Sequence, residues 1–226
     1  MNGEKTVLLL VGSPKARQST SASLGAYLLK LLEAKGFDTN TLSVYQSLPS
    51  KEGLMKLITK VNRADIVVLA FPLYIDSLPS GVIRMMELIA EDRRGKDIRE
   101  GQRFVAIANS GFPEAQHNDI ALAICRRFAA ESGFGWAGGL ALGGGEAIAG
   151  EGLERAGGRA RFARKALGLA AGAFAEGREI PEEAIKLMAR PFVPSRIYTL
   201  IGTMGWKRKA RDNKAIEKIH AKPYEE

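Results

Sequence analysis

The sequence predicts an α/β protein in which a parallel β-sheet is covered by helices on both faces, a doubly wound fold. Two observations predict this fold. Short runs of continuous apolar residues alternate with longer stretches in which apolar residues recur three and four positions apart. Parallel strands are covered on both faces, so their sequences are nearly continuously apolar. Five such runs alternate with five helical stretches, as a doubly wound sheet requires.

Each element follows from its own pattern. The apolar runs predict strands at residues 6–11, 39–45, 66–71, 104–108 and 136–142. The second is the weakest of these runs, and glycine interrupts the fifth. The apolar stripes between them predict helices around residues 24–31, 54–61, 82–89, 121–128 and 162–173. Cys125 lies on the apolar stripe of the fourth helix, where a free cysteine is expected to be buried.

The domain organisation follows from where this alternation stops. We expect residues 1–178 to form the α/β domain and residues 179–226 a basic extension of helical or irregular structure, with a short helix at 182–188. The whole chain carries a formal net charge of +8. From Arg190 onward nine basic residues oppose four acidic ones, a net +5, which leaves about +3 for the rest of the chain. The excess charge therefore belongs to the extension.

The composition excludes several classes of protein. With 226 residues, 46% of them hydrophobic and 26% charged, the chain is neither disordered nor collagen-like. One cysteine cannot form an internal disulfide or a cysteine-rich metal site, which fits a reducing compartment. No stretch reaches the ~20 apolar residues that a bilayer-spanning helix needs, and the run at 6–11 is too short for a signal-peptide core. We therefore expect a cytoplasmic protein.

The loop after the first strand is the strongest candidate for a binding site. Ligands of doubly wound sheets bind beyond the carboxyl ends of the strands. Four hydroxyl residues lie there, close to the start of a helix whose amide groups attract phosphate: Ser13, Ser19, Thr20 and Ser21. The alternative is that they are turn and helix-capping residues, which serine and threonine also favour.

Two nucleotide signatures are absent from this loop. A Walker loop has Gly-Lys-Ser/Thr where this chain has Arg17-Gln18-Ser19, and a dinucleotide loop needs three glycines where only Gly12 is present. The loop fits a phosphate monoester, as in FMN, better than either.

At this point a family resemblance becomes specific. Gly12-Ser13-Pro14-Lys15 followed by Ser19-Thr20 resembles the phosphate loop of the flavodoxin-like NAD(P)H-dependent FMN reductase family. Lys15 replaces the arginine usual in that family, which keeps the charge but loses the forked geometry. The segment after the third strand, from Pro72 through Tyr74 to Pro79, resembles the family's second flavin loop. A rigid, proline-rich loop with an aromatic side chain suits a flavin ring, although a plain turn with Tyr74 in the core remains the alternative.

The resemblance implies a set of FMN contacts, a fold and a reaction. It implies a flavodoxin-like sheet of order 2-1-3-4-5 over about the first 175 residues, noncovalent FMN, and a homodimer. The implied reaction passes hydride from NAD(P)H to the flavin and on to a quinone, a free flavin, a nitro compound or a metal complex. Because the flavin supplies the chemistry, we expect no catalytic acid, base or nucleophile and no metal site. The implied FMN contacts are Ser13, Lys15, Arg17, Ser19, Thr20, Ser21, Pro72, Leu73, Tyr74, Ile75, Asp76, Asn109, Ser110 and Gly111.

Three questions stay open at this level. A flavodoxin-type electron carrier would bind flavin without using a nicotinamide donor, although the resemblance implies an acidic carrier and this chain is basic. The segment 143–146, Gly-Gly-Gly-Glu, fits either a site loop or a structural turn, and His117 fits a surface or capping role better than a place in the cleft. The apolar and basic segment 192–211 fits either weak contact with a membrane surface or packing over the core or a dimer partner; no nucleic-acid module is recognisable.

Overall fold

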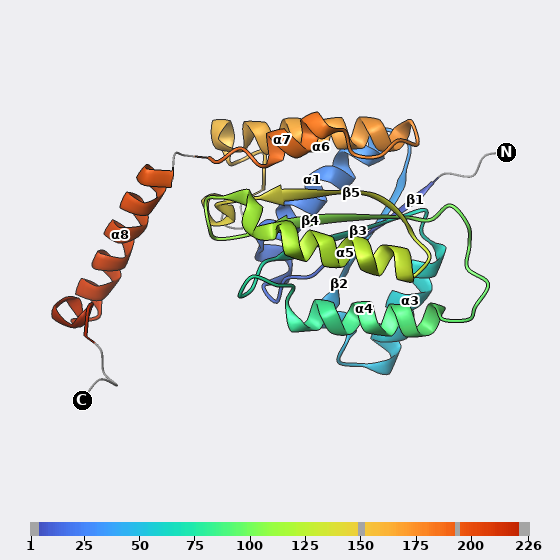
Figure 1. Cartoon of the computed structure of the whole chain (residues 1–226), viewed down its shortest axis with the longest axis horizontal. Helices are drawn as coiled ribbons and strands as arrows, with labels where there is room; N and C mark the ends of the chain where they lie inside the picture. Colours follow the sequence, from blue (N-terminus) through green and yellow to red (C-terminus); the bar gives the residue numbers. More distant parts are fainter. Residues whose placement is uncertain (1–4, 149–151, 193–194, 222–226) are drawn as a thin grey trace. The chain divides into compact units, whose positions relative to one another are not determined.

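The sheet of this protein has five parallel strands. The structure, a computed structural model, describes residues 5–148, 152–192 and 195–221. The strands are β1 (Thr6–Val11), β2 (Asp38–Ser43), β3 (Ile66–Pro72), β4 (Arg103–Asn109) and β5 (Gly135–Leu142). They lie in the order β2-β1-β3-β4-β5 (Figure 1). The predicted flavodoxin-like fold class and strand order are confirmed.

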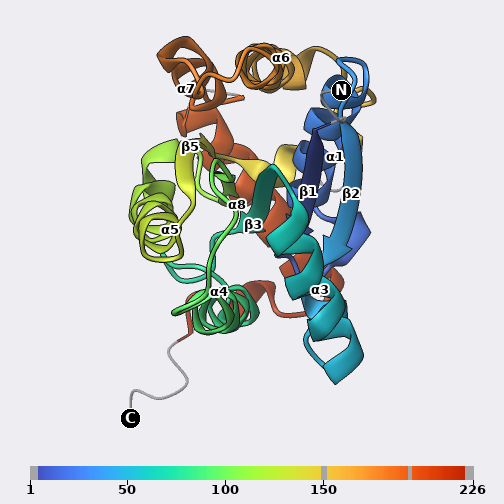
Figure 2. The ribbon, with the colours of Figure 1, turned by 90° about the vertical axis from the view of Figure 1, so that its right-hand side faces the viewer.

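Helices cover both faces of the sheet (Figure 2). One face carries α1 (Thr20–Glu33), α6 (Arg161–Ala175) and α7 (Glu182–Met188). The other face carries α3 (Lys51–Arg63), α4 (Ser80–Arg93) and α5 (Asp119–Glu131). Alternate side chains of β1 supply the two cores: Leu9 packs with α1, whereas Leu8 and Leu10 pack toward α3 and α4. Because both faces are buried, the strand sequence is apolar throughout.

Two strands differ in detail from their predicted form. β2 ends at Ser43 instead of running to residue 45, because the short helix α2 (Val44–Ser47) begins there and the Ser47 hydroxyl donates to the Ser43 carbonyl at 2.9 Å. In β5, Gly138 has a φ of +121° at a register shift opposite β4. A β-carbon on Gly138 would lie 2.8 Å from Ile180 Cβ, so glycine lets the segment before α7 approach the strand.

The chain divides into two compact units. The first runs to Phe192, beyond residue 178 where the sequence analysis ends the α/β domain, because α7 packs against α6 and β5. The second comprises residues 193–226 and contains α8 (Ser195–Asp212), a helix in a stretch for which the sequence predicted only an apolar segment and a basic run. No helix in the described part of the chain is long and apolar enough to cross a membrane.

A buried arginine joins helix ends at the edge where the strands begin. Arg93, at the end of α4, donates from Nε to the Ser132 carbonyl at 2.7 Å and from Nη1 to Asn62 Oδ1 and Gln102 Oε1, both at 2.9 Å. Its guanidinium carbon lies 3.9 Å from the centre of the Phe134 ring. Burial lowers the pKa of Arg93 from its ordinary value, with the neighbouring Asp92 carboxylate opposing the shift. This arrangement belongs to the scaffold, because it lies at the opposite edge from the loops that follow the strands.

Cys125 is fully buried on the inner face of α5, as predicted. Burial raises the pKa of its thiol to about 12. The thiol is therefore neutral and shielded over the whole physiological range of pH.

Candidate functional site

The loops after β1, β3 and β4 meet at one pocket of about 460 Å³. Ligand pockets of proteins begin at roughly 300 Å³. Eleven of the fourteen predicted contact residues line this pocket: Ser13, Lys15, Ser19, Thr20, Ser21, Pro72, Leu73, Tyr74, Asn109, Ser110 and Gly111. Ile75 and Asp76 lie at the tip of the second loop and do not line it, and the side chain of Arg17 falls outside the described residues. Residues separated by about a hundred positions are thus brought together by the parallel sheet.

Gly12 lets the first loop leave β1 close to the neighbouring strand. Its amide donates to the Ala70 carbonyl at 2.8 Å. A β-carbon at this position would lie 2.5 Å from Val82 Cγ2 and 3.0 Å from Phe71 Cβ. The loop therefore begins buried beneath α4, and Ser13, the next residue, is 2% exposed.

The four hydroxyls of the first loop have different tasks in the structure. Ser19 is the N-cap of α1: its Oγ accepts from the Ala22 amide at 3.1 Å and donates to the Ala16 carbonyl at 2.7 Å. Thr20 donates across the pocket to the Gly145 carbonyl at 2.8 Å. Ser13 Oγ and Ser21 Oγ each accept a hydrogen bond, from the Lys15 amide at 3.3 Å and from Asn109 Nδ2 at 2.7 Å, which leaves their protons for a ligand. The capping interpretation therefore holds for Ser19.

The start of α1 adds donors to the same end of the pocket. The first amide groups of an α-helix have no acceptor within the helix, and the helix dipole makes this end positive. In α1 these amides belong to Thr20 and Ser21, both of which line the pocket. The exposed Lys15 lies on the same rim. This end of the pocket is built to receive negative charge.

Asn109 ties the three loops together from beneath. The side chain is buried, and Nδ2 donates both to Ser21 Oγ at 2.7 Å and to the Phe71 carbonyl at 2.9 Å. The backbone carbonyl of Asn109 accepts from the Leu73 amide at 2.7 Å. These bonds hold the floor of the pocket in one geometry before any ligand arrives.

The loop after β3 makes a tight two-residue turn at the mouth of the pocket. Tyr74 and Ser77 exchange backbone hydrogen bonds of 2.9 and 3.1 Å around Ile75 and Asp76, whose φ angles are +46° and +57°. This left-handed backbone usually requires glycine or asparagine, and a β-branched residue in it is strained. The Ile75 side chain is fully exposed and Tyr74 is half-exposed.

The glycine run after β5 has both of the roles left open by the sequence. Gly144 and Gly145 donate to the carbonyls of Phe112 and Ser110 at 2.6 and 2.8 Å, and a β-carbon on Gly143 would lie 2.2 Å from the Pro113 oxygen. The run thus packs backbone against backbone beside the loop after β4. Gly145 and Glu146 also line the pocket, as does Gln18. The sequence left the segment 143–146 open as a possible site loop, whereas Gln18 was missed.

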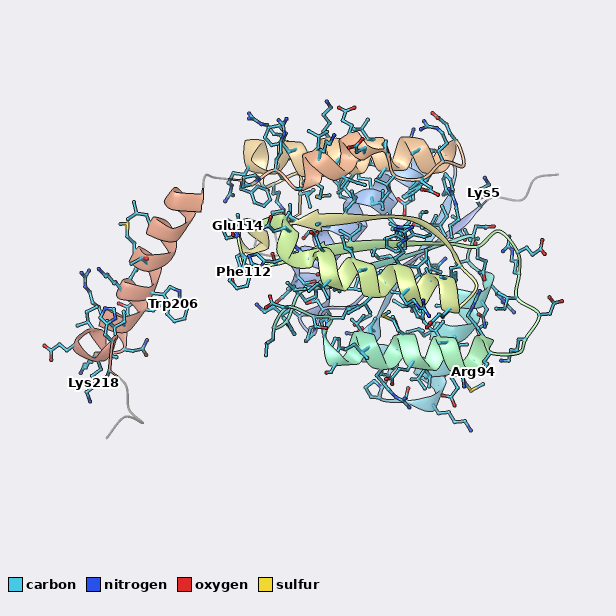
Figure 3. The ribbon with its side chains drawn as sticks, viewed as in Figure 1. Lys5, Arg94, Phe112, Glu114, Trp206 and Lys218 are labelled. Atoms are coloured by element: carbon cyan, nitrogen blue, oxygen red, sulfur yellow. The ribbon has the colours of Figure 1, made fainter. Side chains whose placement is uncertain are left out.

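An exposed aromatic group lies just outside the pocket. The ring of Phe112 is 54% exposed, and its centre lies 4.6 Å from that of His117. His117 Nε2 lies 3.8 Å from a Glu114 oxygen. Figure 3 labels Phe112 and Glu114 at this end of the molecule. None of the three lines the pocket as the structure describes it, so a role for His117 in the cleft stays untested.

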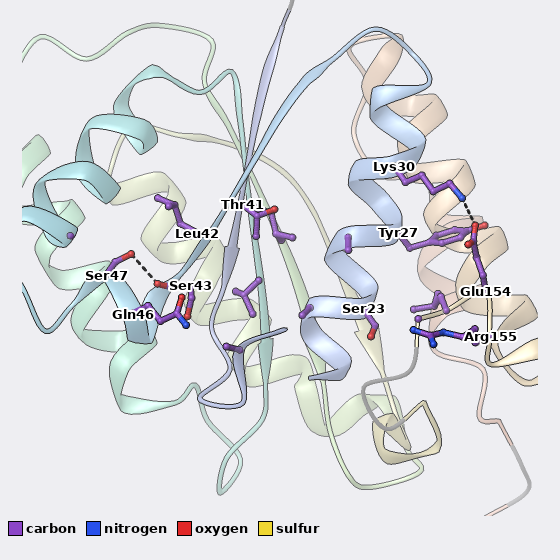
Figure 4. A pocket seen from close by; sticks show the side chains of 18 of the residues that line it. Ser23, Tyr27, Lys30, Thr41, Leu42, Ser43, Gln46, Ser47, Glu154 and Arg155 are labelled. Atoms are coloured by element: carbon purple, nitrogen blue, oxygen red, sulfur yellow. Dashed lines mark hydrogen bonds and ion pairs between the residues drawn. The ribbon is translucent and has the colours of Figure 1, made fainter. Parts of the chain in front are cut away.

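A second cavity, of about 860 Å³, is larger than the candidate site (Figure 4). It lies between the outer face of α1, with Tyr27 and Lys30, and the free edge of the sheet, with Thr41 and Ser43. None of the fourteen predicted contact residues lines it. We identify the site by its convergent donors and its place at the carboxyl ends of the central strands, which here outweigh size.

Similar folds occur in solved structures of reductases. An FMN-dependent NADH-azoreductase from Bacillus anthracis str. Ames Ancestor is 14% identical, with a TM-score of 0.57 over 76% of this chain and 99% of that chain. An NAD(P)H:quinone oxidoreductase from Methanothermobacter marburgensis is 17% identical, with a TM-score of 0.53 over 74% and 96%. A putative quinone reductase from Klebsiella pneumoniae is 16% identical, with a TM-score of 0.54 over 79% and 88%. At these identities the likeness shows the fold alone. No curated protein matches the sequence.

The family model for NADPH-dependent FMN reductases matches residues 6–116. This stretch contains β1 to β4 and the three loops that line the pocket. Over these residues the chain is similar to the NADPH-dependent FMN reductases, which are oxidoreductases.

Proposed function

We propose that the protein binds FMN in the pocket formed by the loops after β1, β3 and β4, and passes hydride from NAD(P)H through the flavin to a small-molecule acceptor. The observation that carries the proposal is the convergence of eleven predicted residues from three loops on one pocket, one end of which is lined by hydroxyl groups, helix amides and Lys15. The family match over the same loops supports it.

The chain's own residues would bind and orient the cofactor. The amides of Thr20 and Ser21, the protons of Ser13 and Ser21, and the Lys15 ammonium would hold the phosphate. The segment Pro72–Tyr74 would flank the ring, and Asn109–Gly111 its polar edge. FMN supplies the redox chemistry when bound, so the protein needs to supply only binding, orientation and electrostatics.

The rim of the pocket favours flat, apolar acceptors. Tyr74, Ile75 and Phe112 are exposed apolar or aromatic side chains on the loops that surround it. Of the acceptors that the family resemblance implies, a quinone, a free flavin or a nitroaromatic compound would bury this surface better than a hydrated metal complex.

The same rim supports a homodimer. Exposed apolar side chains around a binding site are commonly covered by another surface, and a second copy of this chain would cover them here. We further propose that the enzyme works in the cytoplasm, since its one cysteine is buried and reduced. Sedimentation of the purified protein tests the dimer.

The visible spectrum of the purified protein tests the central proposal. We expect flavin absorbance, release of FMN on denaturation, and bleaching of the flavin by NADH or NADPH under anaerobic conditions. Reoxidation by a quinone or a nitroaromatic compound should follow. A colourless protein that fails to take up added FMN would contradict the proposal.

The electron-carrier alternative has its own outcome in the same experiment. A carrier would bind FMN and be bleached by dithionite, but not by either nicotinamide. That result would retain the binding site and exclude the reductase reaction.

A further inference from the structure

The helix α8 exposes three large apolar side chains to solvent. Leu200, Met204 and Trp206 are 61%, 63% and 73% exposed. Leu200 and Met204 are four residues apart and share one side of the helix, whereas Trp206 lies on another side. Scattered single apolar residues are normal on protein surfaces, whereas a contiguous patch marks an interaction site.

The next turn and a half of α8 is strongly basic. Lys207, Arg208, Lys209 and Arg211 follow Trp206 directly, and all four are exposed. Met204 lies four residues after Leu200, and Arg208 four after Met204, so one side of the helix changes from apolar to basic along its length. Over residues 195–221 seven basic residues oppose two acidic ones, Asp212 and Glu217.

We propose that α8 binds the surface of an anionic lipid bilayer. Leu200 and Met204, on one side of the helix, would enter the boundary between headgroups and acyl chains, and the basic residues would contact lipid phosphates. Trp206 lies where the apolar part meets the basic part, the level at which tryptophan gathers in membranes.

Charge favours this occupant over the two others that fit a basic apolar helix. A nucleic acid would neutralise the basic residues but leave the apolar side chains in water. A second copy of α8 would bring two segments of equal positive charge together. Of these three, an anionic bilayer is the one that satisfies both the apolar and the basic half of the helix. The proposal does not depend on flavin binding.

Co-sedimentation of the full-length protein with lipid vesicles tests the proposal. We expect binding to vesicles of equal parts phosphatidylcholine and phosphatidylglycerol, weaker binding to phosphatidylcholine alone, and release from the mixed vesicles as salt rises. No binding to the mixed vesicles at low salt would overturn it.

Matched variants show whether α8 carries the binding. The pair Leu200→Ser and Met204→Ser should reduce partition into mixed vesicles about tenfold or more. The control pair Ile120→Ser and Met55→Ser removes side chains that are 66% and 61% exposed on the first unit, and should leave partition unchanged. Equal loss in both pairs would overturn the assignment to α8.

A second pair separates charge from apolar contact. Lys207→Gln with Arg208→Gln should lower partition by about fivefold per residue. Lys51→Gln with Lys56→Gln, two exposed lysines of α3, is the control and should have little effect. Melting curves should be the same for all variants, because the changed side chains are exposed.

The fluorescence of Trp206 reports the insertion directly. With Trp136→Phe, Trp206 is the only tryptophan of the chain. Its emission should shift to the blue when mixed vesicles are added and be quenched by brominated acyl chains. A blue shift that depends on protein concentration in the absence of vesicles would indicate self-association and overturn the proposal. Binding to a polyanion such as a nucleic acid would also overturn it, if that binding were as tight as binding to vesicles and unaffected by Leu200→Ser and Met204→Ser.

Discussion

Gly12 shows how a single backbone position sets the geometry of the binding loop. Because Gly12 has no side chain, the chain can leave β1 and enter the loop in close contact with Phe71 and Val82. Gly12→Ala should lower the free energy of unfolding by about 1–3 kcal/mol, since either the strand end or α4 must move. Urea unfolding measures this.

Gly168 supplies the matched control for that substitution. It lies inside α6 with no atom within 4 Å of where a β-carbon would lie. Gly168→Ala should therefore stabilise the protein by about 0.5–1 kcal/mol. If the two substitutions had equal effects, the close approach at Gly12 would not matter for stability.

Ile75 is the most strained side chain near the site. A left-handed backbone costs an ordinary L-residue about 1–2 kcal/mol, and asparagine tolerates it better. Ile75→Asn should therefore raise the free energy of unfolding by about 0.5–1 kcal/mol in urea. Ile120→Asn, at an exposed site in α5, should bring no gain. A loss of stability in Ile75→Asn would mean that the isoleucine makes a stabilising contact.

At the scale of residues, the sequence could predict which residues form the site better than it could predict the hydrogen bonds among them. Runs of hydroxyl residues and prolines after strands mark binding loops, so eleven contact residues could be predicted to lie together. That Thr20 uses its proton within the protein could not be predicted, because its acceptor, the Gly145 carbonyl, lies 125 positions away. Gln18 carried no local pattern that separates a pocket residue from an ordinary polar one.

At the scale of elements, Arg93 joins the ends of several helices and strands. Lysine keeps the charge but has neither the length nor the forked donors to reach Ser132, Asn62 and Gln102 together. Arg93→Lys should destabilise the protein by about 2–4 kcal/mol in urea. The exposed neighbour Arg94 is the control: Arg94→Lys should stay within about 0.5 kcal/mol. Similar values for both variants would contradict the bridging role.

Asp92 makes the same helix end sensitive to pH. Its hydrogen bond from Lys96, and a lesser one from Asn62, hold the pKa of this carboxyl below its ordinary value, with burial opposing the shift. Such a carboxyl stabilises the fold above its unfolded pKa of about 4, and this stability is lost as pH falls through the lower folded value.

Asp92→Asn should accordingly cost about 0.5–1 kcal/mol at pH 7, and the difference from the unchanged protein should narrow as pH falls below about 4. Urea unfolding over a pH series measures both. Lys96→Gln should remove most of the effect of Asp92→Asn, because the two groups act as a pair. A difference that stays constant with pH would contradict the shift.

Helices and strands could be predicted where the pattern of apolar residues in the sequence matches the faces that are buried in the fold. β1, β3 and β4 are apolar because both of their faces are buried, and their predicted ranges lie within about a residue of the structure. β2 ends early because the Ser47 hydroxyl competes for the Ser43 carbonyl, a local bond that no apolar pattern reveals. α8 escaped prediction because its polarity changes along the axis, whereas helix periodicity detects polarity around it.

At the scale of the whole molecule, a bound cofactor should stabilise only the unit that holds it. FMN at about a hundred times its dissociation constant adds ~2.7 kcal/mol to a unit that binds it only when folded. For a unit of this size we expect the melting temperature to rise by about 5–10 °C, and to fall equally when FMN is removed. Calorimetry with and without FMN measures the change.

Two lysine variants test whether the rise in melting temperature on adding FMN comes from binding at the candidate site. Lys15→Gln should shrink the rise in melting temperature, since Lys15 lies at the phosphate end of the pocket. Lys51→Gln, an exposed lysine that does not line that pocket, should not. An unchanged melting temperature on adding FMN would contradict the binding site as a whole.

The burial of Cys125 also makes the protein convenient to label. A neutral thiol enclosed in the core will not react with maleimides under native conditions, and the chain has no second cysteine. A cysteine introduced at Met204 or at Ile75 would therefore be the single attachment point for a dye or a spin label. Without replacing Cys125, the basic helix and the mouth of the pocket can each be observed separately in solution.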